Sequence, residues 1–159
     1  WAYDNPTSFR KGHLAGRAGY EYRSTTRAVK EDIKYSNTFF DIQKRVMRLY
    51  KIPTALKENI GMDKGFITVI TKPDGYTHKH KDATQDTNHC VRFNIVVQAP
   101  DEGGILTVGD QTVSTEECEL HCYSATRWEH YVTKVKGVTD RIVVIFGFSV
   151  GNDWEMGTF

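Results

Sequence analysis

Two histidines and a carboxylate lie within residues 77–82, which read THKHKD. Side chains two positions apart on an extended chain point to the same side, so His78, His80 and Asp82 would share one face. Two imidazoles and one carboxylate on one side of an ion are the ligand set that holds non-haem Fe(II) and leaves coordination positions open. The segment therefore supplies most of such a metal site.

His130 is the residue that we expect to complete this site. It follows Asp82 by 48 residues, which about five or six strands and turns of ordinary length would occupy. A late strand can then return beside an early one. A ligand pair made of His78 and His80 is an alternative. We prefer His80, Asp82 and His130, which leaves His78 beside the metal or facing a substrate.

Arg141 is a candidate for binding a small acidic molecule. It begins the apolar run 142–146 (IVVIF), which is typical of a buried central strand. A guanidinium at the entrance of an apolar pocket requires an anionic partner, because an isolated charge is costly there. A dicarboxylate can provide that partner through a two-pronged contact.

Helical signals are confined to the first part of the chain. The apolar residues of 39–50 recur at steps of three and four, which predicts a helix that begins after Ser36 or Asn37 and stops at Pro53. Its aromatic stripe is typical of packing against a sheet. The other N-terminal expectations are a helical turn at 54–59 and a short strand near 19–22, within the loop-like residues 1–30.

From residue 65 onward the pattern becomes β. Short runs of β-branched and aromatic residues alternate with turns every eight to twelve residues, which is typical of a sandwich or barrel such as a double-sheet jelly roll. The predicted strands are 66–71, 77–82, 90–98, 105–108, 112–113, 120–123, 128–135 and 141–149.

We therefore expect a mainly β protein with N-terminal helices, in one domain spanning residues 1–159. Its parts would be an arm with supporting helices (1–62), a β core (63–150) and a C-terminal tail (151–159).

The net charge of +1 gives no reason to expect a polyanionic partner for the whole molecule. The charge is uneven, however, because residues 1–30 carry six basic and two acidic side chains. We favour a solvated arm for this segment. The alternative is an arm that contacts an acidic partner.

Cysteine usage and hydropathy bear on the compartment. The three cysteines are too few, and odd in number, for a disulfide framework. We therefore expect reduced thiols in a cytoplasmic protein. No apolar run approaches the length of a membrane span, so we expect no membrane partner.

Several of these segments together resemble the 2-oxoglutarate- and Fe(II)-dependent oxygenases, in their prolyl-4-hydroxylase-like branch. The resemblance covers residues 65–149. It implies a double-stranded β-helix, a jelly-roll or cupin-like fold. The segments that carry it are 80–82 (HKD), 102–106 (EGGIL), 124–132 (SATRWEHYV), Arg141 and 146–148 (FGF).

The resemblance also implies an activity. His80, Asp82 and His130 would bind Fe(II), and Arg141 would pair with the far carboxylate of 2-oxoglutarate. The enzyme would hydroxylate a C–H bond with O2 and release succinate and CO2, with ascorbate as an added reductant. A prolyl residue of a peptide or protein is the favoured target. The alternatives are an oxygenase acting on a nucleobase or small molecule, and a non-catalytic cupin-like metal-binding domain.

One departure from the family pattern concerns the co-substrate. The prolyl-hydroxylase-like branch often has a tyrosine in the strand after the metal pair, whereas residues 91–97 read VRFNIVV. Arg92 or Asn94 would take its place if they face inward, and otherwise they face solvent. Tyr76 and Trp128 are candidates for lining the pocket, although packing is the simpler role for Trp128.

Overall fold

The computed structural model describes residues 9–11, 25–28, 36–52, 66–82 and 88–155. Within these residues the chain forms one helix, α1 (Asn37–Leu49), and a series of mostly short strands. The strands are β1 (Phe9–Lys11), β2 (Thr25–Ala28), β3 (Ile67–Thr71), β4 (Thr77–His80), β5 (Asn88–Gln98), β6 (Glu102–Gly103), β7 (Leu106–Val108), β8 (Gln111–Thr112), β9 (Leu120–Ser124), β10 (His130–Val132), β11 (Val135–Lys136) and β12 (Arg141–Gly151).

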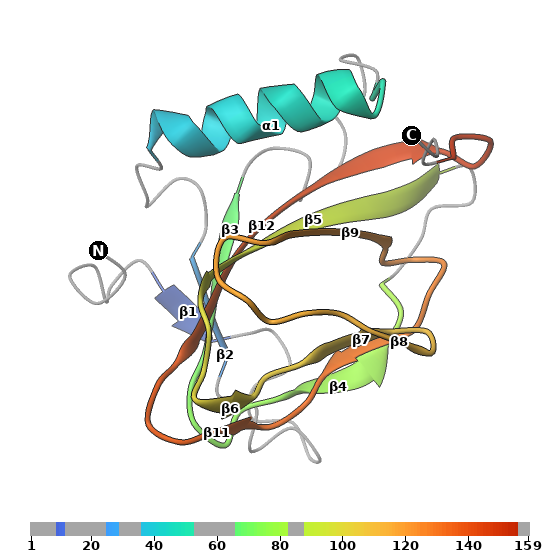
Figure 1. Ribbon diagram of the computed structural model, residues 1–159. Coiled ribbons are helices and arrows are strands. Elements are labelled where there is room, and N and C mark those ends of the chain that lie inside the picture. Colours follow the sequence, from blue (N-terminus) through green and yellow to red (C-terminus); the bar gives the residue numbers. More distant parts are fainter. Residues whose placement is uncertain (1–8, 12–24, 29–35, 53–65, 83–87, 156–159) are drawn as a thin grey trace.

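The strands form two main antiparallel sheets. The large sheet has the order β1-β2-β3-β12-β5-β9, and the small sheet has the order β4-β10-β7-β8. A third, two-stranded ladder pairs β11 with β6. Helix α1 lies on one side of the large sheet, and the small sheet lies on the other (Figure 1). The expected mainly β chain with helix ahead of it is confirmed.

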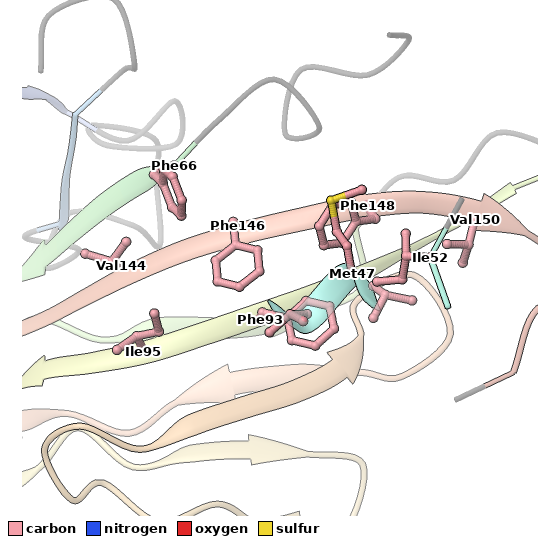
Figure 2. Close-up of a cluster of buried hydrophobic side chains, with 11 residues drawn as sticks. Met47, Ile52, Phe66, Phe93, Ile95, Val144, Phe146, Phe148 and Val150 are labelled. Carbon is pink, nitrogen blue, oxygen red and sulfur yellow. The ribbon is translucent and has the colours of Figure 1, made fainter. Parts of the chain in front are cut away.

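The main core lies between α1 and the outer face of the large sheet. Every second residue of β5 and β12 points to this face, so the apolar residues of both strands gather under the helix. Phe93 and Phe146 stack with their ring centroids 5.2 Å apart. Figure 2 shows this cluster, which contains Val46, Met47, Ile52, Phe66, Val91, Phe93, Ile95, Val144, Phe146, Phe148 and Val150.

The helix begins and ends close to the predicted positions. Ser36 is its N-cap and has an extended backbone, although its side chain makes no capping hydrogen bond. The helix ends at Leu49, before Pro53. Lys51 adopts a φ of 50°, a left-handed conformation that turns the chain out of the helix. No helix among the described residues has the length and apolar character needed to cross a membrane.

Some predicted elements differ from those observed. The single strand expected at 128–135 is two strands, β10 and β11, because the chain changes partners after Val132 from β7 to β6. The prediction that residues 1–30 are mainly loop is wrong for residues 9–11 and 25–28. These form β1 and β2, which extend the large sheet beyond β3. The expected strand near 19–22 and helical turn at 54–59 lie outside the described residues.

The inner face of the large sheet carries the residues that alternate with the core. On β5 these include Arg92 and Asn94, which flank the fully buried Phe93. They face the small sheet, where His80 and His130 lie on β4 and β10. Because side chains alternate along this part of β5, its apolar residues face α1 and its polar residues face the small sheet.

Truncation of the stacked phenylalanine should be severe. We expect Phe93→Ala to lower the free energy of unfolding by about 3–5 kcal/mol, because the side chain is fully buried among rings. Urea denaturation followed by circular dichroism measures this. Val97→Ala is the control on the same strand, since Val97 is 43% exposed. Equal losses in the two variants would contradict this description of the core.

Candidate metal centre

The structure brings together the three residues predicted to bind a metal. One ligand atom from each of His80, Asp82 and His130 lies within 4.8 Å of the others. His80 and His130 are directly paired across β4 and β10, and paired residues of antiparallel strands present their side chains on one face. Their ring centroids are 4.3 Å apart. The register of these two strands therefore builds the site.

Asp82 reaches the site from just beyond the end of β4. Its backbone N–H donates to the carbonyl oxygen of Ala125 at 2.9 Å, which ties this segment to the turn after β9. Its Oδ1 lies 3.5 Å from His80 Nε2 and 4.0 Å from His130 Nε2. Atoms that share an ion at about 2.1 Å lie no farther apart than about 4.2 Å, so both distances fit a common metal.

Hydrogen bonds to backbone carbonyls orient both imidazoles. His80 Nδ1 lies 2.7 Å from the carbonyl oxygen of His78, and His130 Nδ1 lies 3.2 Å from that of Trp128. A proton on Nδ1 leaves Nε2 as the ligand atom, an arrangement common in metal sites. Nε2 of His130 is buried and has no hydrogen-bond partner in the described part of the chain. This is expected of a nitrogen atom that serves as a metal ligand.

Burial also keeps His130 in the form that a metal requires. The side chain is 3% exposed. This desolvation, together with the charge of Arg92 nearby, lowers the pKa of His130 to about 4. The imidazole is therefore neutral at neutral pH, and a neutral imidazole is the ligand form. The donor set of two imidazoles and one carboxylate suits Fe(II).

Arg92 controls the acidic ligand. Its guanidinium donates to Oδ2 of Asp82, while Oδ1 faces the two imidazoles. Burial alone would raise the pKa of Asp82, but the neighbouring His80 and the charge of Arg92 outweigh it and lower the pKa. The carboxylate is thus charged and offers one oxygen to a metal. Sequence reasoning placed Arg92 toward the co-substrate, whereas its described ion pair is with Asp82.

Asn94 and Arg141 provide further polar atoms. Asn94 is 4% exposed and Arg141 is 5% exposed, so neither faces solvent. Burial lowers the pKa of Arg141 to about 10, against the opposing influence of Tyr123. Asn94 Oδ1 and Arg141 Nε are buried and lack hydrogen-bond partners among the described residues. Buried polar atoms of this kind are uncommon without a ligand or water to satisfy them.

Gly104 makes room for the Arg141 side chain. A Cβ atom at Gly104 would lie 2.9 Å from Cδ of Arg141 and 2.8 Å from Cγ of Pro100, and the φ of Gly104 is +63°. A larger residue there would both strain the backbone and displace the guanidinium stem.

Tyr123 was missed by the sequence reasoning. It lies opposite Arg92 on β9 and forms hydrogen bonds with Arg92 and Asn94. Its ring centroid is 5.2 Å from that of His130. Its role could not be predicted, because it depends on the pairing of β9 with β5, which the sequence does not reveal.

Three other predicted residues lie outside the ligand group. His78 packs against Tyr76, with ring centroids 4.7 Å apart, and both line a hollow between β4 and β10. The structure therefore does not bring His78 into the group formed by His80. Trp128 is 58% exposed and lies against Gly109, so it does not belong to the core.

Comparison with solved structures shows what the fold resembles. A prolyl-4-hydroxylase from Pseudomonas putida matches with a TM-score of 0.63 and 13% identity, over 91% of this chain and 79% of that chain. A 2-oxoglutarate–Fe(II) oxygenase family oxidoreductase from Burkholderia pseudomallei matches with a TM-score of 0.45 and 17% identity, over 58% of this chain. The matched part spans 45% of that oxidoreductase.

A cupin-2 domain from Rhodospirillum rubrum matches with a TM-score of 0.44 and 12% identity, over 94% of this chain and 73% of that one. No protein-family model matches the sequence, and no curated protein matches it. At these identities the likeness concerns the fold. The chain has the double-stranded β-helix fold that the resemblance implied.

Removal of the buried imidazole should abolish metal binding. We expect His130→Ala to lose Fe(II) in anaerobic equilibrium dialysis, because two ligands hold the ion weakly. His78→Ala is the matched control, and it should retain one Fe(II) per chain. Full occupancy in the His130 variant, or loss in the His78 variant, would contradict the ligand group described here.

The ion pair between Arg92 and Asp82 should affect the affinity of the site for a metal, although Arg92 is not itself a ligand. We expect Arg92→Gln to weaken Co(II) binding about 10–100-fold, as is usual when a residue that orients a ligand is lost. The visible spectrum of bound Co(II) should also change, since Oδ2 becomes available as a second ligand atom. Arg92→Lys keeps the charge and should change both less. An unaltered affinity and spectrum in Arg92→Gln would refute this role.

Proposed function

We propose that this chain is a 2-oxoglutarate- and Fe(II)-dependent hydroxylase that acts on a prolyl residue of a peptide or protein. The observation that carries the proposal is the convergence of His80, Asp82 and His130 within one double-stranded β-helix that also buries a cation, Arg141. 2-Oxoglutarate would require a metal ion for its keto acid end and a cation for its far carboxylate. The triad would hold the metal ion, and Arg141 would supply the cation.

The residues divide the binding of iron and 2-oxoglutarate between them. His80, Asp82 and His130 would hold Fe(II), which supplies redox chemistry with O2 and 2-oxoglutarate when bound. Arg141 would bind the far carboxylate of 2-oxoglutarate, because its buried charge has no ion pair among the described residues. Asn94 is positioned on the adjacent strand to accept or donate a further hydrogen bond.

Apolar packing beside the ligands would exclude water. Leu106, Ala125 and Val132 are buried with Tyr123 in a second hydrophobic cluster between the sheets. His130 belongs to the same strand as Val132 and contacts the ring of Tyr123. A dry surrounding protects a reactive oxidant from side reactions.

Prolyl substrate is supported by one structural likeness. The Pseudomonas putida protein described as a prolyl-4-hydroxylase matches 91% of this chain with a TM-score of 0.63. At 13% identity this is support for the proposal and carries no residue-level assignment. The competing interpretation is a cupin-like domain that binds metal without turnover.

Succinate formation separates an enzyme from a binding domain. Purified protein incubated with Fe(II), 2-oxoglutarate, ascorbate and O2 should form succinate, and a proline-containing peptide should gain the mass of one oxygen. Arg141→Ala should raise the 2-oxoglutarate concentration needed for half-maximal rate about 100-fold, since a charged hydrogen bond contributes about 1.5–3 kcal/mol.

Arg141→Lys is the conservative control and should fall between the wild type and the alanine variant. Fe(II) binding should be unchanged in both, because Arg141 is not a ligand. If the wild type forms no succinate, the proposed enzymatic function is refuted. If Arg141→Ala requires the same concentration of 2-oxoglutarate as the wild type, the proposed role of Arg141 is refuted.

A further inference from the structure

A cleft of about 730 Å³ lies beside the metal centre. Its lining comes from β9, the turn between β7 and β8, and the segment that follows β12. Two of its lining residues connect it to the ligands. Tyr123 contacts the ring of His130, and Val108 is the strand partner of His130. We call this space the β9 cleft. A molecule bound in it lies next to the groups that surround the metal.

One wall of the β9 cleft is an open sheet edge. β9 is the last strand of the large sheet and, in the described part of the chain, pairs only with β5. Ala125 N–H donates to the Cys90 carbonyl, and Val96 N–H donates to the Glu119 carbonyl. Hydrogen-bonded and non-hydrogen-bonded pairs alternate along an antiparallel ladder. These two bonds therefore assign the odd-numbered residues 119–125 to the bonds with β5.

The peptide groups of Leu120 and Cys122 consequently point away from β5. Both residues line the β9 cleft, and Leu120 is 42% exposed. An open edge of this kind is a template to which another extended chain can add as a strand.

Two tryptophans face the same cleft. Trp128 is 58% exposed and lies over Gly109, where a Cβ atom would be 3.6 Å from Cε3 of the indole. Trp154 packs near the ring of His89, with centroids 6.1 Å apart. Indole surfaces bind ring side chains well, and exposed tryptophans commonly dominate the affinity of peptide sites.

The charges around the cleft do not suit a polyanion. The ionised lining residues are Arg127, Asp110 and Glu155, and Arg127 already donates to the carbonyl of Asn152. The two lining histidines, His89 and His121, both have a pKa lowered chiefly by burial. The cleft thus has a small negative charge, whereas nucleic-acid sites require excess lysine and arginine.

We propose that the β9 cleft binds an extended, neutral or basic peptide segment, which adds as a strand to the outer edge of β9 and packs a ring side chain on Trp128. The role of this peptide as substrate rests on the proposed hydroxylase function, but its binding does not. Such a cleft favours a peptide as the substrate over the nucleobase that was an alternative from the sequence.

Binding is tested in the absence of 2-oxoglutarate and metal, so that it is independent of turnover. The probe is the synthetic peptide Ac-KTVPVTK-NH2, and the signal is intrinsic fluorescence, because Trp128 and Trp154 line the cleft. We expect saturable binding by the wild type. Trp128→Ala should weaken it at least tenfold, and Val138→Ala, at a 90% exposed position between β11 and β12, should leave it unchanged.

Leu120→Pro tests the strand addition separately. Proline removes an N–H that points away from β5, so the ladder within the sheet is kept while the edge loses a donor. We expect at least a tenfold loss of affinity in this variant. Hydrogen exchange of the wild type should show peptide-dependent protection of the Leu120 and Cys122 amides. This second measurement stands even if the proline variant fails to fold.

Four outcomes would overturn the proposal. These are no peptide binding by the wild type, unchanged binding by Trp128→Ala, displacement of the peptide by a ten-base oligothymidylate, and protection of the Leu120 and Cys122 amides that depends on protein concentration alone. The last would assign the edge to a second copy of the chain. Peptide binding without succinate formation would support the cleft and refute only the proposed enzyme.

Discussion

The pairing of His80 with His130 is the constraint on which the rest of the site depends. These residues belong to strands that are far apart in the sequence but neighbours in the small sheet. Their register places two imidazoles on one face, and the chain after β4 then needs only two residues to deliver Asp82. Because side chains alternate along a strand, a shift of one position would point one of the imidazoles away from the other.

The large sheet supports this arrangement by separating two chemistries. Its outer face is closed by α1 and contains stacked aromatic rings. Its inner face carries Arg92, Asn94 and Tyr123. Tyr123 forms hydrogen bonds with the other two, and Arg92 donates to the acidic ligand. The polar groups are held by rigid strands and are backed by a close-packed core, which keeps them in position better than loops would.

Much of this was predictable from local patterns. The continuous apolar run of β12 and the helical stripe that ends before Pro53 each reflect short-range chemistry. The spacing of His80 and Asp82 identified a pair of ligands, and the distance along the chain together with the resemblance of residues 124–132 to the oxygenase pattern favoured His130. The ion pair between Arg92 and Asp82 was not predictable, since it depends on how the strands meet in space.

The split between β10 and β11 was also hidden. It depends on Gly103 and Gly104, which both have positive φ and allow β6 to take over as partner. The N-terminal strands β1 and β2 lacked a clear alternation, so the pairing of β1 with β2 and of β2 with β3 reflects the sheet rather than their own sequence.

The position of Phe93 between Arg92 and Asn94 has a consequence for folding fidelity. A slip of β5 by one residue against β12 would push a guanidinium and an amide under α1 and expose an aromatic ring to the ligands. Each of these exchanges is unfavourable, so competing alignments of the central strand are separated from the native one by a wide energy gap. The order Arg92, Phe93, Asn94 thus disfavours wrong strand alignments during folding, before any metal is bound.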